Sequence, residues 1–396
     1  MPETVRPCVR AVVNFAETAG LARKVAVLTP LISVKGWKSN AIMESIPHSG
    51  ASAKGDAGLP STAEKVRFLS TPGAYLHASA SVAVLETHMS YVFLAGDKVY
   101  KLKKPVRSPF LDFSTIEARE RNCREEVRLN RRLAADVYLG VAPLTYRPQS
   151  GMALGGDGAV VDWLVEMRRL PREAMLDRLI AEDRVSATQI DALCDTLSNF
   201  YRGVERAAIS AEDYALRFFR EQEKNRDVLT RRDFALDHGR TPLLLDLLDA
   251  RLAASRSQLQ ERVLQGQIVD GHGDLRPEHI CLRDPIAIFD CLEFNAELRQ
   301  VDPFDELAYL GVECALLGAK TLGAELVDKV AQRLSCEPPR RLISLYAAWR
   351  AVLRARQSVA HLLDDAPRKP TKWEPLATRY LNLAQSALGA DNRTGR

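Results

Sequence analysis

Two acidic residues in the second half of the chain constrain its folding most strongly. Asp274 lies in the glycine-flanked stretch 271–274, and Asp290 follows the short apolar stretch 286–289. A turn at 284–285 separates this second stretch from another apolar run at 280–282, so we predict two short strands here. Helical patterns precede and follow the region. We therefore expect a loop and a strand pair to interrupt a mainly helical part of the chain.

The first half of the chain has the pattern of an antiparallel sheet. Runs of β-branched and aromatic residues alternate with turn signals such as Gly96-Asp97. Ser114 begins a stretch with the form of a capping box, which indicates a helix. We predict five strands with one helix inserted after the third. The predicted strands cover residues 81–86, 91–95, 98–103, 142–146 and 159–168.

The remainder of the chain is predicted to be mostly helical. The expected helices cover residues 173–183, 186–205, 211–230, 242–265, 303–318, 320–334, 338–364 and 374–388. The fold class is therefore α+β, with a small antiparallel N-lobe and a large, mainly helical C-lobe. We divide the chain into a loosely ordered extension, the N-lobe, and the C-lobe with its catalytic and metal-binding loops. These parts cover residues 1–62, 63–170 and 171–396.

Composition excludes several classes of function. The 396 residues include 55 basic and 51 acidic ones, a net charge of +4, which does not favour a nucleic-acid-binding surface. The basic residues between 119 and 132 alternate with glutamates, which indicates the solvated face of a helix. No apolar run is long enough for a membrane span. The seven cysteines have no metal-ligand spacing and suit buried thiols in a reducing compartment. We expect a cytoplasmic protein.

The two acidic residues match the needs of phosphoryl transfer. One carboxylate receives or orients the proton of the acceptor hydroxyl, and another holds a magnesium ion that bridges the phosphates of ATP. We assign the first role to Asp274, with His272 beside it in the same turn, and the second to Asp290. Strand alternation predicts that Ile288 and Asp290 share a face. The plainer alternatives are a polar turn at 272–274 and a water-exposed strand end at Asp290.

The chain resembles the protein-kinase-like fold and, within it, the aminoglycoside phosphotransferase superfamily. The resemblance covers about residues 68–320, and the His-Gly-Asp segment is its most specific part. The stretches 86–94, 99–105 and 110–115 are similar to a bacterial aminoglycoside phosphotransferase-like group of unassigned substrate. The resemblance implies a two-lobed fold with ATP and Mg²⁺, or Mn²⁺, bound between the lobes.

A phosphate-binding lysine is expected on the third strand. Lys101 is the first choice, with Lys103 on the same face as the second. A lysine in a cleft needs a counter-charge, for which we choose Glu126, with Glu125 as the alternative. The plainer interpretation is that both lysines are solvated side chains on an edge strand.

The resemblance also implies contacts to the nucleotide outside the lysines. No glycine-rich loop lies between the first two strands, so Ser90 or Thr87 would serve the phosphates instead. Glu166 and Met167 are placed like the segment that meets the adenine through backbone groups.

His279 occupies the position where the superfamily usually has Asn. Three outcomes are open: the imidazole ligates a softer divalent ion, contacts the ion through water, or fails to bind a second ion. Glu278 could supply an oxygen if the loop is shifted.

Two further groups of charged residues receive structural interpretations. Asp302 is expected to cap the helix that follows it, and Asp305 to support the catalytic loop. The arginines at 350, 354 and 356 are interpreted as a solvated helix face.

The leading hypothesis is an ATP-dependent phosphotransferase acting on a hydroxyl of a small molecule. The alternative is a nucleotide-binding pseudokinase that serves as a regulatory or partner module. A third reading is a metallohydrolase with His272, Asp274 and His279 as ligands, but no dense His/Asp cluster elsewhere completes such a shell. The sequence does not identify the acceptor, and we expect no nucleic-acid or membrane partner.

Overall fold

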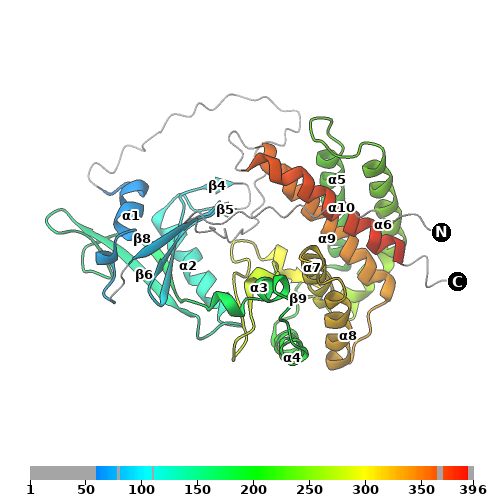
Figure 1. The fold of residues 1–396 in the computed structure, drawn as a ribbon, viewed down its shortest axis with the longest axis horizontal. Coiled ribbons are helices and arrows are strands. Elements are labelled where there is room, and N and C mark those ends of the chain that lie inside the picture. Colours follow the sequence, from blue (N-terminus) through cyan, green and yellow to red (C-terminus); the bar gives the residue numbers. More distant parts are fainter. Residues whose placement is uncertain (1–58, 78–80, 109–110, 364–368, 391–396) are drawn as a thin grey trace, which may run out of the picture.

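The computed structural model describes residues 59–77, 81–108, 111–363 and 369–390, which form two lobes (Figure 1). The predicted extension lies outside the described residues except for its last four. Within these, Ser61 caps the helix α1 (Thr62–Leu69) through a capping box with Glu64. We did not predict this helix, although its capping signal is present in the sequence.

The N-terminal lobe is built on one antiparallel sheet of six strands, one more than predicted. The additional strand is β7 (Gly151–Leu154), which pairs with β6 and has only four residues, too few for a recognisable alternation. The sheet runs in the order β1 (Val82–Glu86), β2 (Ser90–Ala95), β3 (Lys98–Lys103), β8 (Ala159–Arg168), β6 (Tyr138–Arg147) and β7.

Helices cover both faces of this sheet. On one face Leu69 of α1 belongs to a buried cluster that also contains Tyr100 and Leu102. On the other face lies the inserted helix α2 (Ile116–Asn130), whose Val127 joins a cluster with Val165. The N-cap of α2 is Thr115, one residue later than the predicted Ser114. The minor strands β4 (Arg107–Ser108) and β5 (Leu111–Asp112) pair in the connection before α2.

One basic residue of α2 contradicts the solvated face predicted for residues 119–132. Arg119 is buried and donates to both carboxylate oxygens of Asp162 on β8, at 2.7 and 3.0 Å. Arg124 and Arg128 do lie on an exposed face, paired with neighbouring glutamates. The helix is therefore attached to the sheet by a buried ion pair as well as by apolar contacts.

The C-terminal lobe contains the eight predicted helices (Figure 1). They are α3 (Leu176–Ala181), α4 (Ala187–Gly203), α5 (Ala211–Leu229), α6 (Arg240–Leu264), α7 (Pro303–Leu316), α8 (Leu322–Leu334), α9 (Arg340–Ala360) and α10 (Trp373–Ala390). The predicted strand pair is present as β10 (Ile280–Cys281) and β11 (Ala287–Ile288), and a second pair joins β9 (Val269–Asp270) to β12 (Gln300–Val301). The α+β fold with an antiparallel lobe and a mainly helical lobe is thus confirmed.

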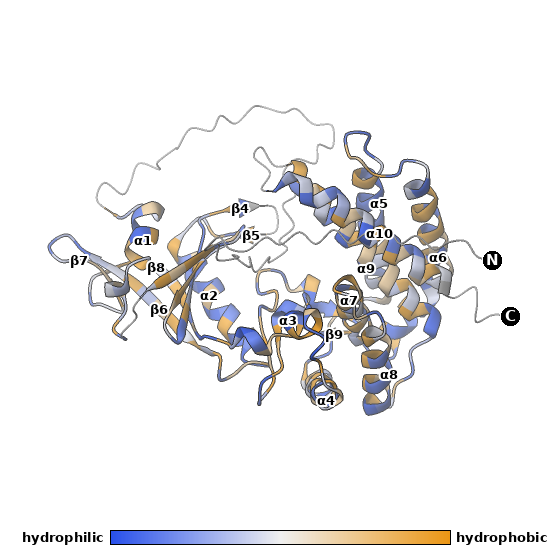
Figure 2. Cartoon of the chain, viewed as in Figure 1, coloured by the Kyte–Doolittle hydropathy of each residue, from blue (hydrophilic) through white to orange (hydrophobic). Residues whose placement is uncertain are grey.

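One large core holds the helical lobe together. Buried residues from α3 to α10 form a continuous cluster, and Figure 2 shows hydrophobic and hydrophilic residues alternating round α4 and α8. No described helix is both long and apolar enough to cross a membrane. The predicted domain boundaries and the cytoplasmic location stay predictions.

Helices α7 and α8 cross at two glycines in direct contact. A Cβ added at Gly311 would lie 2.8 Å from the Cα of Gly323, which is backbone and cannot move aside cheaply. We expect Gly311→Ala to lower the free energy of unfolding by about 1–3 kcal/mol, the usual cost of overpacking. Gly203→Ala is the matched control, because a Cβ there meets nothing within 4 Å. Urea unfolding measures both, and equal stability of the two variants would contradict this packing.

The solvated helix face predicted for the arginines of α9 is wrong. Arg350 is buried and paired with Asp305, and Arg354 is buried and paired with Glu313. Arg356 is likewise buried and paired with a glutamate of α5. The partners come from other helices, so periodicity within α9 could not indicate them. The supporting role predicted for Asp305 agrees with this arrangement.

Asp302 caps α7 as predicted. Its carboxylate accepts a hydrogen bond from the backbone N–H of Phe304 and is fully buried. It also accepts two hydrogen bonds from Arg262, at 2.6 and 3.0 Å, and one from Tyr346. The cap is therefore part of a buried network that fixes the start of α7 below the loop containing Asp274.

Candidate active site between the lobes

A cavity of about 810 Å³ lies between the sheet and the helical lobe. The N-terminal lobe forms one wall of the cavity with the face of its sheet that carries Leu94, Val99, Lys101 and Met167. Phe289 and Asp290 continue the lining, and side chains of α9 and α10 close the far end. A cavity of this size with an apolar wall and a few charged groups is typical of a small-molecule site.

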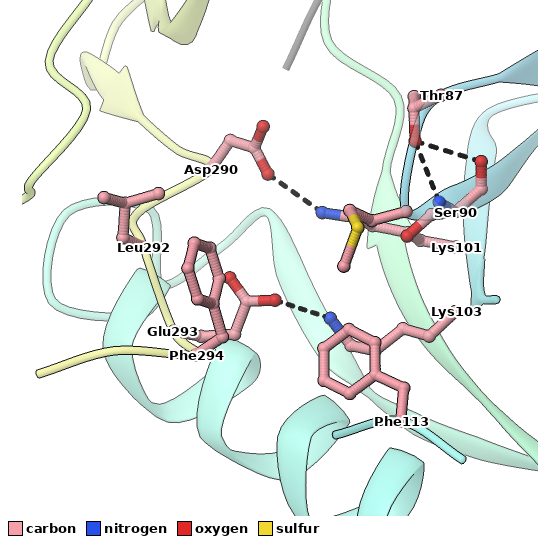
Figure 3. Close-up of a pocket in the computed structure, with 10 residues that line it drawn as sticks. Thr87, Ser90, Lys101, Lys103, Phe113, Asp290, Leu292, Glu293 and Phe294 are labelled. Atoms are coloured by element: carbon pink, nitrogen blue, oxygen red, sulfur yellow. Dashed lines mark hydrogen bonds and ion pairs between the residues drawn. The ribbon is translucent and has the colours of Figure 1, made fainter. Parts of the chain in front are cut away.

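Lys101 connects the two lobes at the centre of the cavity wall. Its Nζ lies 2.9 Å from Oε1 of Glu126 on α2. It also lies 2.9 Å from Oδ1 of Asp290, the residue that comes two positions after β11 (Figure 3). The predicted pairing of Lys101 with Glu126 is therefore present, whereas Glu125 pairs with Arg128 on the surface. The two carboxylates outweigh the effect of burial and raise the pKa of Lys101 well above its usual value. The amine is held as a cation.

Lys103 lies deeper than Lys101 and does not line the large cavity. Its side chain is 1% exposed, and its Nζ lies 2.5 Å from Glu126 Oε2 and 2.7 Å from Glu293 Oε1 (Figure 3 shows the contact with Glu293). The ring of Phe113 lies 5.2 Å from the same amine. Glu126 thus bridges both lysines. We interpret Lys103 as a residue that positions Glu126, rather than as the phosphate contact predicted for it.

Asp290 reaches the site by a backbone turn, not by strand alternation. Strand β11 ends at Ile288, and Asp290 has a φ of 63°, in the left-handed region. The prediction that Ile288 and Asp290 share one strand face is therefore wrong. Burial raises the pKa of Asp290, but the ammonium of Lys101 outweighs this effect, so the pKa lies well below its usual value. The side chain is a carboxylate at neutral pH.

The His-Gly-Asp turn is held from two sides. His272 is 1% exposed, and its Nε2 lies 2.9 Å from the carbonyl oxygen of Phe289, while its Nδ1 accepts from the backbone N–H of Asp274. Burial lowers the pKa of His272 to about 4, so the ring is neutral. With both nitrogens engaged, His272 ties the turn to the segment before Asp290. We interpret it as a positioning residue, not the catalytic one predicted.

Glu306 of α7 also holds the His-Gly-Asp turn in place. Its carboxylate accepts from the backbone N–H of Gly273, whose φ of 84° favours glycine, and from the hydroxyl of Tyr201 at 2.9 Å. Burial raises the pKa of Glu306 to about 7 from an ordinary value of 4.5. Asp302 fixes the start of α7, and Glu306 near that start in turn fixes the His-Gly-Asp turn.

This raised pKa predicts a dependence of stability on pH. The folded protein keeps the Glu306 proton up to about pH 7, whereas the unfolded chain releases it near 4.5. The folded state therefore binds more protons than the unfolded chain in this window. The contribution of Glu306 to the free energy of unfolding is fully present below pH 4.5 and falls by ~3 kcal/mol as pH rises through 7. Glu306→Gln has no proton to lose and should flatten this part of the stability–pH curve. Urea unfolding across the window measures the slope, and an unchanged slope in the variant would contradict the assignment.

Asp274 is buried beside the cavity but does not line it. Tyr309 of α7 donates to its Oδ1 at 3.0 Å, and its Oδ2 has no hydrogen-bond partner among the described residues. Arg276 Nη1 lies 3.8 Å from that Oδ2, and Arg276 itself lines the cavity with its ion-pair partner Glu278. The carboxylate therefore has one oriented oxygen and one oxygen available for a proton, directly behind a charged pair in the wall.

His279 lies between the two acidic residues. It is fully buried, its Nδ1 lies 2.9 Å from the backbone oxygen of Asp274, and its Nε2 lies 3.6 Å from Asp290 Oδ2. That Nε2 has no hydrogen bond among the described residues. Glu278, the alternative oxygen donor, instead pairs with Arg276.

Asp290 and His279 could supply two protein donors to a divalent ion in this part of the site. An unpaired imidazole nitrogen and a carboxylate oxygen lie within reach of one another, and a mixed N/O donor pair suits Mn²⁺ better than Mg²⁺. The described residues contain no group of three or more His, Cys, Asp or Glu side chains that could hold a metal alone. Further ligands would have to come from a bound nucleotide. The His272–Asp274–His279 shell of the metallohydrolase reading is not formed.

The remaining predicted nucleotide contacts are divided between the faces of the sheet. Met167 lines the cavity, whereas the side chain of Glu166 points to the opposite face, where Lys98 and Tyr100 donate to it. Ser90 is buried at the start of β2, and its backbone N–H donates to Thr87 Oγ1 at 2.9 Å (Figure 3). Thr87 lines the cavity and Ser90 does not. The backbone role predicted for Glu166 does not require its side chain in the cavity.

Several residues of the site were not assigned to it from the sequence. No role is predicted from the sequence for Tyr309, Arg276 or Glu306. A signal exists for Arg276, since it lies two residues after Asp274 in the same loop. Tyr309 and Glu306 lie on α7 three residues apart and so share a face, but their partner loop lies over thirty residues away.

No protein-family model matches the chain. Uncharacterized proteins of Mycobacterium tuberculosis (strain H37Rv) and Mycobacterium bovis are each 33% identical to it over 310 residues. These alignments cover 78% of this chain and 60% of each relative. The chain thus spans less than two thirds of the length of the curated relatives that it matches.

Several solved structures align with most of this chain at low sequence identity. A choline/ethanolamine kinase family protein from Mesorhizobium loti has a TM-score of 0.47 and 14% identity, covering 82% of this chain and 93% of that one. An ethanolamine kinase from Plasmodium vivax has a TM-score of 0.45 and 10% identity, covering 77% and 81%. An aminoglycoside phosphotransferase from Streptomyces rimosus, solved with ADP and streptomycin, has a TM-score of 0.35 and 16% identity, covering 66% and 90%.

Proposed function

We propose that the protein is an ATP-dependent phosphotransferase that moves the γ-phosphate of ATP to a hydroxyl of a small molecule. The single observation that carries this proposal is the position of Lys101. Its amine joins Glu126 of one lobe to Asp290 of the other, at 2.9 Å from each, in the wall of a large cavity. A lysine oriented by one carboxylate next to a second carboxylate suited to a metal is the arrangement that phosphoryl transfer requires.

The nucleotide would lie against the sheet. The apolar side chains of Leu94, Val99, Met167 and Phe289 line this part of the cavity and suit a base. Lys101 then lies at the phosphates, where its cation neutralises charge. Its orientation survives the exchange of Asp290 for a phosphate partner, because Glu126 is held independently by Lys103.

The residues around Asp274 would receive the acceptor. Tyr309 orients one carboxylate oxygen, and the other oxygen is positioned to take the proton of an attacking hydroxyl. The Arg276–Glu278 pair separates this oxygen from the cavity, so the acceptor must reach it at this pair. A divalent ion on Asp290 and His279 would neutralise the phosphate charge that develops during transfer.

A second candidate is a nucleotide-binding module without transfer activity. The observation that favours it is that Asp274 is absent from the cavity lining, combined with an imidazole where an oxygen or amide ligand is usual. Substituting His279→Asn separates the two candidates. An enzyme keeps or gains turnover with the amide ligand, whereas a binding module shows no turnover in either form.

A thermal-shift panel tests the proposed function. ATP and GTP are added with Mg²⁺ or Mn²⁺ to the wild type and to Asp290→Ala. We expect a nucleotide-dependent rise in Tm of the wild type that is larger with the divalent ion, and no effect of the ion in the variant. Absence of any nucleotide effect on the wild type would refute both the phosphotransferase and the binding module.

A further inference from the structure

The far end of the cavity is walled by charged residues of the helical lobe. Five of them line it and are referred to here as the charged wall: Arg276, Glu278, Glu313, Arg354 and Lys372. They lie opposite the sheet, on the side where the acceptor would enter. The charge of this wall therefore decides which acceptors can bind.

Both carboxylates of the charged wall are already engaged. Glu313 is buried, accepts from Arg354 Nε at 2.7 Å, and accepts from the Tyr380 hydroxyl at 2.9 and 3.0 Å with its two oxygens. Glu278 is paired with Arg276. An ammonium group could use either carboxylate only by separating it from a guanidinium, and breaking a buried pair is costly. The wall therefore offers no carboxylate to a cationic acceptor.

The remaining carboxylates of the cavity are likewise paired. Asp177 accepts two hydrogen bonds from Arg172, at 2.5 and 2.6 Å. Glu126 and Asp290 both contact Lys101. Every carboxylate that lines the cavity is thus neutralised by a cation within the described part of the chain.

Lys372 gives the charged wall a net positive charge, because the other two cations of the wall are each paired with a glutamate. No carboxylate among the described residues lies within ion-pair distance of its amine, which lies 4.9 Å from the ring centroid of Trp373. Trp373 also lines the cavity and stacks with His361 at 4.1 Å. Burial, followed by repulsion from Lys369, Arg354 and Arg276, lowers the pKa of Lys372, and the carboxylate of Glu278 opposes this effect without cancelling it. Repulsion among these cations would be relieved by an anion bound between them.

We propose that the acceptor is a small hydroxyl compound with a carboxylate or phosphate group, which Lys372 binds at the end of the charged wall. The inference rests on the proposed function and names the class of its substrate. It excludes amino alcohols and amino sugars as preferred acceptors. The anionic group would lie at Lys372 and the aromatic surface of Trp373, and the hydroxyl would point towards Arg276 and Asp274.

Two matched series of acceptors test this class. The first contains glycerate, glycerol phosphate, glycerol and aminopropanediol, and the second contains glucuronate, glucose and glucosamine. Members of each series keep a common carbon frame and differ mainly in charge. ADP formation is measured with each, together with the Tm of the protein loaded with a non-hydrolysable ATP analogue. We expect an anionic member to give the highest kcat/KM and the largest shift in at least one series.

Three variants assign the effect to Lys372. Lys372→Met should reduce kcat/KM for the anionic acceptor about tenfold, the usual loss of one charge-assisted contact, with KM for ATP unchanged. Lys372→Arg should restore most of it. Lys369→Met removes a cation from the same segment that does not line the cavity, and should leave the preference for anions in place.

The outcomes separate this inference from the proposed function. If the wild type binds nucleotide but prefers a cationic or neutral acceptor, or if no anionic member is bound or phosphorylated, the inference is wrong and the nucleotide site stands. If Lys372→Met keeps the full preference for anions, the assignment to Lys372 is wrong. If the wild type binds no nucleotide, the proposed function fails and this inference fails with it.

Discussion

Replacement of Asp274 by Asn is expected to lower kcat by about 10³-fold, because the carboxylate that takes the hydroxyl proton is lost. The amide oxygen can still accept the hydrogen bond that Tyr309 donates to Asp274 Oδ1, so the local structure should persist. ATP affinity should not change, since Asp274 does not line the cavity. Steady-state kinetics with the acceptor, together with nucleotide titration, measures both effects.

Asp157→Asn is the matched control for this substitution. Asp157 has a side chain that is 84% exposed and, among the residues that the structure describes, forms an ion pair with Arg147 alone. Its kinetics should equal those of the wild type. Turnover of Asp274→Asn at the level of this control would show that Asp274 is not the proton acceptor.

Replacement of Lys103 by Met is expected to cause the largest loss of stability. The substitution removes a cation that is 1% exposed and leaves the carboxylates of Glu126 and Glu293 buried, at positions 2.5 and 2.7 Å from the missing amine. Removing one partner of a buried ion pair costs about 3–5 kcal/mol. Glu126 keeps Lys101 as a partner, so most of the penalty should fall on Glu293. Urea unfolding measures the change.

A lysine on the same strand provides the control for Lys103. Lys98 pairs with Glu166 at 2.5 Å, but its side chain is 33% exposed, so Lys98→Met should cost no more than about 1 kcal/mol. Adding Glu293→Gln to Lys103→Met should recover part of the loss, because the unpaired charge is removed. Equal stability of the two single variants would mean that Lys103 is not part of a buried network.

The helices and the main sheet could be predicted because local patterns specify them. Helix α8 repeats its apolar residues at Leu322, Leu326 and Val330, the spacing of one helical face. Strand β7 and helix α1 were missed because each is short. Helix α1 is also stabilised by contacts with the sheet, which no local pattern reports.

The site could be predicted in part, for a similar reason. Strand alternation placed Lys101 on the cavity face, and the need of a lysine in a cleft for a counter-charge suggested Glu126 on the following helix as its partner. The left-handed turn at Asp290 could not be predicted, because it depends on contacts with Tyr138 and Lys101 from the other lobe. The burial of Arg354 has the same explanation, since its partner Glu313 lies forty-one residues away.

The affinity of ATP measured by isothermal titration, with excess Mg²⁺ or Mn²⁺ and again with EDTA, tests the central claim most directly. That claim is that Asp290 and Lys101 form one metal–nucleotide site. For the wild type we expect the divalent ion to strengthen ATP binding by at least about tenfold, which is ~1.4 kcal/mol. For Asp290→Ala we expect the same affinity with and without the ion. Equal affinities in the wild type, or an undiminished ion effect in the variant, would contradict the account.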